Sequence, residues 1–118
     1  MLEEKDIPGV LNAGQFPGWG HFGWHCITPF HNIAGMLTEA ASASLATPIY
    51  IHPEQLGGGA RQFPDYEAQS TIPSLWEGGC WRVRDIIQYQ KVASWAIMDL
   101  AARKRETVLW NGYLKAKR

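Results

Sequence analysis

The longest regular pattern of apolar and polar positions lies in the C-terminal third of the chain. Between residues 81 and 105 there is neither glycine nor proline, and apolar residues recur at three- and four-residue steps, which places them on one face of a helix. These positions are Val83, Ile86, Ile87, Val92, Ala93, Ala96, Ile97, Leu100 and Ala101. The pattern predicts an amphipathic helix over 81–105, long enough to need a sheet or other helices to pack on.

Two shorter apolar runs predict strands within residues 31–52. Residues 48–52 (PIYIH) combine branched and aromatic side chains, which favour a strand. The run 33–38 (IAGMLT) is ambiguous, because methionine, leucine and alanine also favour a helix. We interpret it as a buried strand that ends at Glu39. Two short strands cover only part of so long a helix.

Glycine and proline interrupt the remaining segments. Residues 1–30 and 53–80 read as irregular loops, and residues 106–118 as a basic tail. Long loops are unusual in a small independent domain. The fold class we expect is α/β: a mixed sheet of which this chain holds two short strands, long loops and one long C-terminal helix. Residues 1–118 are therefore expected to form a partial domain.

Charge, apolar runs and cysteine content limit what the chain is expected to bind and where it is expected to lie. The chain has 118 residues, with 11 Lys and Arg against 11 Asp and Glu, so electrostatic capture of nucleic acid is not expected. It holds no run of about 18 apolar residues, so we expect no membrane span. Residues 1–6 are acidic and do not resemble a signal peptide, and the compartment stays undetermined. Cys26 and Cys80 are expected to be free thiols rather than a disulfide.

Glu39 is the strongest candidate for chemistry. It follows an apolar run, where burying a free carboxylate is costly. A carboxylate in such surroundings finds a partner or holds its proton more tightly, and it can then act as a general base near neutral pH. The alternative is an ordinary glutamate on a helix surface or in a capped turn.

The histidines give no metal-binding motif. His21 and His25 are four residues apart, a spacing that suits zinc on a helix, but Gly20 and Gly23 argue against a helix there. We interpret both as loop histidines. Neither a Cys/His cluster nor a nucleophile motif occurs elsewhere, so we expect no metal ligand in this chain alone.

Four motifs in the same order resemble the end of the catalytic domain of the zinc carboxypeptidase family. Residues 31–39 (HNIAGMLTE) and 45–48 (LATP) are similar to that family's "HN-x-x-G-x-LTE" strand and the "ATP" that follows it. Residues 78–89 (GGCWRVRDIIQY) resemble its "GGWWRLRDIVDY" helix start, with Cys80 in place of the first tryptophan. Residues 110–114 (WNGYL) resemble its "NFY" ending with a substitution. The resemblance spans almost the whole chain.

The resemblance implies a specific role for Glu39. In that family two histidines and a glutamate hold a zinc ion, and a separate glutamate at the end of a late strand acts as general base and proton shuttle. Glu39 matches that separate glutamate. The family's zinc ligands, its H-x-x-E motif and its substrate-binding arginine would all lie upstream of the residues present here. The resemblance therefore implies peptide as substrate and zinc as cofactor for the full-length family, and an inactive chain when isolated.

Two other interpretations remain open. The chain can be a non-catalytic remnant that binds a partner, or a tryptophan-rich module that binds glycans through residues such as Trp76. A partial domain should also expose apolar surface, so we expect marginal stability or self-association. Similar proteins are often secreted, which leaves localisation open.

Overall fold

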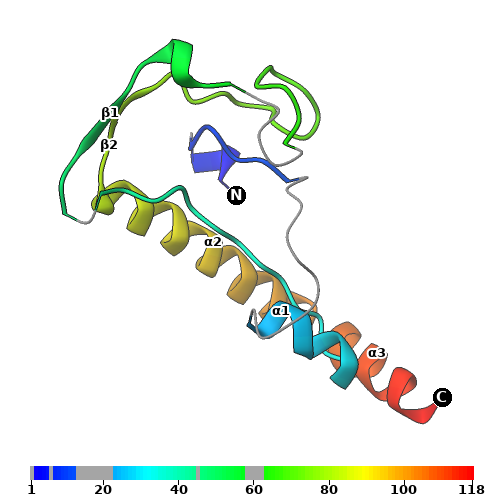
Figure 1. Cartoon of the computed structure of the whole chain (residues 1–118). Helices are drawn as coiled ribbons and strands as arrows, with labels where there is room; N and C mark the ends of the chain where they lie inside the picture. Colours follow the sequence, from blue (N-terminus) through cyan, green and yellow to red (C-terminus); the bar gives the residue numbers. More distant parts are fainter. Residues whose placement is uncertain (1, 6, 13–22, 45, 58–62) are drawn as a thin grey trace. The chain divides into compact units, whose positions relative to one another are not determined.

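The computed structural model describes residues 2–5, 7–12, 23–44, 46–57 and 63–118 (Figure 1). Its elements, in chain order, are η1 (Glu3–Lys5), α1 (Trp24–Ile27), η2 (Thr28–His31), β1 (Ile49–Ile51), η3 (Pro53–Gln55), β2 (Gly79–Trp81), α2 (Val83–Arg103) and α3 (Arg105–Lys117). The chain is thus mixed α/β, with a small two-stranded sheet and a long C-terminal helical region. No helix among the described residues is both long enough and apolar enough to cross a membrane.

The chain divides into two compact units. The first unit comprises Met1–Gln15 and Ala40–Ala93, and the second comprises Phe16–Glu39 and Ser94–Arg118. Helix α2 begins in the first unit and ends in the second.

The sheet of the first unit is an antiparallel pair of short strands (Figure 1). Ile49 lies opposite Trp81, Tyr50 opposite Cys80, and Ile51 opposite Gly79. Close approach at the start of β2 requires glycine: Gly78 has a φ of +93°, and a Cβ there would lie 2.7 Å from the carbonyl oxygen of Ile51. A side chain at position 78 would therefore strain the backbone and clash with β1.

Aromatic side chains form the core of the first unit. The Trp81 ring is buried and meets the rings of Trp76 and Tyr89 edge-on, at centroid distances of 5.6 and 5.3 Å. Its Nε1–H donates a hydrogen bond of 2.9 Å to the carbonyl oxygen of Ala41. Edge-to-face rings with a satisfied indole N–H are a stable way to bury tryptophan. This cluster ties the end of β2 to the first turns of α2.

Local hydrogen bonds fix the start of α2. The Asp85 carboxylate accepts a 2.9 Å hydrogen bond from the backbone N–H of Arg82, just before the helix begins. This is one half of a capping box, and an acidic residue in the first turn also suits the helix dipole. The residues of the apolar stripe over 83–101 thus form a helix, as the sequence predicts.

The second unit combines α1, η2 and the extended chain after them with the C-terminal helices. Asn32 ends η2 in the left-handed region, with a φ of 59°, and its backbone N–H donates to the carbonyl of Pro29. Asparagine tolerates this conformation better than most residues. In this unit only Cys26 is buried among the described apolar residues, and most of the exposed large apolar side chains of the protein lie here.

Four expectations about elements need correction. Residues 1–30, expected to be an irregular loop, contain η1, α1 and most of η2 among the described residues. Residues 33–38 are irregular rather than a strand, and Ile33 and Met36 are exposed. No strand pairing among the described residues involves this segment. The end of the loop assigned to 53–80 enters strand β2. The tail assigned to 106–118 is largely helix α3. The strand expected at 48–52 is confirmed as β1, and the helix expected over 81–105 is confirmed as α2 with ends two residues inside the expected bounds.

Candidate functional site

Glu39 lies in the irregular segment that follows η2. It is the last residue of Phe16–Glu39, the first of the two segments that make up the second unit. Its side chain is exposed, and in the part of the chain that the structure describes it has neither a hydrogen-bond nor an ion-pair partner. The expected burial at the end of an apolar strand is therefore not observed. Nothing in the described surroundings of the Glu39 carboxylate orients a reacting group.

Each described histidine has different neighbours. His25, expected in a loop, instead lies in α1, which begins one residue after Gly23. Its Nε2 is 3.3 Å from Sγ of the neighbouring Cys26, in a half-buried position. His31 ends η2 and is exposed. His52 precedes η3, where its backbone N–H donates 2.8 Å to Gln55 Oε1 and its ring meets Tyr50 edge-on at 4.9 Å. His21 lies outside the described residues.

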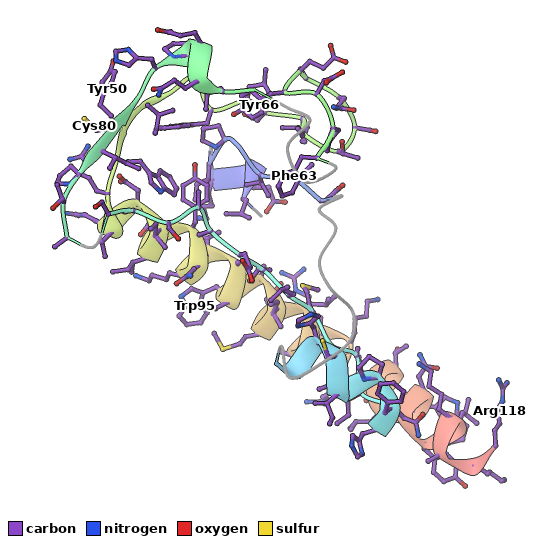
Figure 2. The ribbon with its side chains drawn as sticks, viewed as in Figure 1. Tyr50, Phe63, Tyr66, Cys80, Trp95 and Arg118 are labelled. Carbon is purple, nitrogen blue, oxygen red and sulfur yellow. The ribbon has the colours of Figure 1, made fainter. Side chains whose placement is uncertain are left out.

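The described residues do not fit a zinc ion. Nowhere among them do three histidine, cysteine, aspartate or glutamate side chains gather as metal ligands would. Cys26 and Cys80 are free thiols, as expected, and Cys80 is exposed on β2 (Figure 2). No step of a reaction is therefore assigned to a metal held by these residues.

Tyr89 is the titratable group most affected by folding. Its hydroxyl donates a 2.7 Å hydrogen bond to the carbonyl oxygen of Pro8. Burial raises the pKa of the Tyr89 phenol, and the nearby Tyr66 and Asp85 act in the same direction. Because its hydroxyl is engaged with the backbone and its ring packs on Trp81, Tyr89 holds the first unit together rather than serving as an acid or base.

A second hydrogen-bonded contact in the aromatic core of the first unit joins Tyr66 to the backbone of Trp76. The Tyr66 hydroxyl donates to the carbonyl oxygen of Trp76 and accepts from the backbone N–H of Trp76, both at 2.9 Å. Trp76 is half-buried and packs on Trp81. This use of Trp76 in packing gives no support to a glycan-binding platform at that residue.

A hollow of about 220 Å³ lies in the first unit beside Tyr66. Its lining is mostly apolar and includes Leu11, Phe63, Pro64 and Ile72; Figure 2 labels Phe63 and Tyr66. The Tyr66 hydroxyl is already bonded to Trp76, so the lining offers packing and little chemistry. The neighbouring Thr71 hydroxyl is buried without a partner among the described residues.

Comparison with protein-family models, with curated proteins and with solved structures found no match to this chain. The assignment of chemistry therefore depends on the residues themselves.

Sequence reasoning missed the aromatic core and its hydroxyl links. The signal was present in residues 76–89, where tryptophans and a tyrosine bracket the glycine pair 78–79. It also missed α3, because residues 105–117 mix charged and apolar residues on the same face and contain Gly112.

Proposed function

We propose that this chain is the C-terminal part of a zinc-dependent carboxypeptidase-like hydrolase, with Glu39 as the general base. The observation that carries the proposal is the order of four sequence motifs, from residues 31–39 to residues 110–114, at spacings that match the end of that family's catalytic domain. The substrate of the complete domain would be a peptide, and zinc would be its cofactor. The isolated chain would be inactive.

The distribution of apolar side chains supports a partial domain. The apolar residues that are buried in the described structure are Cys26, Ile72 and Trp81, whereas Phe30, Ile33 and other large side chains are exposed. A complete globular domain of this length normally buries most of its large apolar side chains. The exposed side chains of Phe30, Ile33 and Met36 are what a domain would present to strands and helices that lie elsewhere.

An exposed Glu39 is compatible with the proposal on one condition. A general base works within hydrogen-bond reach of the proton that it takes, and geometry in a free enzyme is often loose. In the proposed domain, strands supplied from upstream would pair with residues 33–38 and place Glu39 beside the metal-binding residues. The carboxylate would then take a proton from the attacking water and give it to the leaving amine.

The decisive experiment uses the polypeptide extended upstream of residue 1. We expect it to bind zinc and hydrolyse peptides, and we expect Glu39→Gln to lower kcat by at least about a hundredfold without changing zinc content, because the removed group acts only on the proton. Glu54→Gln is the matched control, since Glu54 is an exposed glutamate in η3, and it should leave kcat unchanged.

The proposal fails if the extended polypeptide holds zinc but Glu39→Gln retains full activity. It also fails if the 118-residue chain alone binds zinc at stoichiometry, because the described residues have no ligand set for it.

A further inference from the structure

Helix α3 carries a stripe of exposed side chains that no described part of the chain covers. Glu106, Leu109, Trp110, Tyr113, Leu114 and Lys117 recur at three- and four-residue steps, so they share one face of the helix. Leu109, Trp110 and Tyr113 have 72, 59 and 53% of their surface exposed. We call these six residues the α3 stripe.

Two observations set the α3 stripe apart from a scatter of surface residues. The rings of Trp110 and Tyr113 are stacked at a centroid distance of 5.4 Å, which makes one continuous aromatic surface. Gly112, on another face of the helix, is half-buried and lies near the carbonyl of Asn32 in the same unit. The helix therefore turns a different side toward its own unit and leaves the α3 stripe to solvent.

The α3 stripe is complementary to a second α3 stripe that runs in the opposite direction. If two α3 helices lie antiparallel and cross between positions 111 and 112, Leu109 of one copy faces Leu114 of the other, and Trp110 faces Tyr113. The same register sets Glu106 of each copy opposite Lys117 of the other. Apolar side chains then meet at the centre and opposite charges meet at both ends. A parallel pair would place like charges together at each end.

We propose that the α3 stripe is a docking surface for a second copy of this chain, which binds through an antiparallel pairing of the two α3 helices. Such a contact is two-fold symmetric and uses the same patch on both copies. It does not depend on the peptidase assignment.

The size of the α3 stripe indicates a weak dimer. Its four apolar side chains expose roughly 100 Å² each, on a scale where a large aromatic side chain can bury about 150–250 Å². Two copies would therefore bury about 800 Å² in total, below the roughly 1,200 Å² of stable complexes. We expect a dimer that dissociates on dilution.

Charge reversal at the ends of the α3 stripe tests the pairing. Glu106→Lys and Lys117→Glu each place like charges opposite one another at both ends of the dimer. We expect each to weaken dimerisation about tenfold, measured by sedimentation velocity over a concentration series. The double variant Glu106→Lys/Lys117→Glu restores opposite charges in the antiparallel register and should recover the original affinity.

Lys115→Glu is the matched control, because it makes the same change in charge as Lys117→Glu at an exposed position off the α3 stripe. Val108→Ala is the apolar control, at a residue 52% exposed on the other side of the helix. Both should leave the affinity unchanged, and far-UV circular dichroism should show equal helix content in all variants. A monomeric parent chain, an unrestored double variant, or controls that weaken association equally would each overturn the proposal.

Discussion

At the scale of single residues, Tyr89 makes the stability of the first unit depend on pH. Burial keeps the Tyr89 pKa above its ordinary value of about 10 in the folded chain, so the unfolded chain loses this proton first as pH rises. The contribution of Tyr89 to stability is therefore complete below about pH 10 and is lost progressively above it. We expect the urea midpoint of the first unit to fall as pH rises above about 10.

Tyr89→Phe separates the hydrogen bond from the ring. It should lower the free energy of unfolding by about 1 kcal/mol at pH 7, because the carbonyl of Pro8 loses its donor while the contact with Trp81 remains. It should also flatten the alkaline fall in stability. Tyr50→Phe is the control, since Tyr50 is 59% exposed on β1, and it should change neither quantity.

The residue scale also shows why the candidate site could be predicted only in part. Residues 31–39 point to Glu39 only through a resemblance to a motif, and the burial expected for its carboxylate is not observed. The hydroxyl links of Tyr66 and Tyr89 join residues far apart in sequence, to Trp76 and Pro8. Periodicity within a segment carries no information about such contacts.

At the scale of elements, the start of β2 depends on glycine. Gly78→Ala should lower the free energy of unfolding by about 1–3 kcal/mol, because the new Cβ meets Ile51 and the backbone stays in a region that alanine disfavours. Gly57→Ala is the control: its φ is not in that region and its Cβ would meet no described atom within 4 Å. Chemical denaturation followed by near-UV circular dichroism measures both.

An equal loss of stability in the two glycine variants would contradict this account, because it would point to a general effect of removing glycine from a loop.

The elements that the sequence predicted correctly are those whose signal is local. The gap-free apolar stripe of α2 and the branched residues of β1 need no knowledge of their neighbours. Residues 33–38 have strand-like composition but lie exposed and irregular, because a strand also requires a partner for its backbone hydrogen bonds. Helix α3 forms although charged residues share a face with its apolar residues and Val108 lies on another face, a mixed pattern in which periodicity gives little signal.

At the scale of the whole molecule, the exposed apolar surface predicts marginal stability. With Cys26, Ile72 and Trp81 as the buried apolar residues described, little hydrophobic stabilisation opposes the conformational entropy of the chain. We expect a broad thermal transition and strong binding of the dye ANS at neutral pH. The polypeptide extended upstream should bind less dye and melt more sharply. A sharp two-state transition of the 118-residue monomer with no dye binding would contradict the proposed partial domain.

The contrast between the burial of Trp81 and the exposure of Trp95 and Trp110 has a spectroscopic consequence. Trp81 is hydrogen-bonded to Ala41 within an apolar cluster, so its indole should emit at shorter wavelength than those of Trp95 and Trp110, which meet water at 58 and 59% exposure. Unfolding of the first unit's core would then lower the emission intensity at short wavelength. A molecule that binds over α3 would instead shift the emission at long wavelength. The protein thus contains its own optical reporters for two separate events.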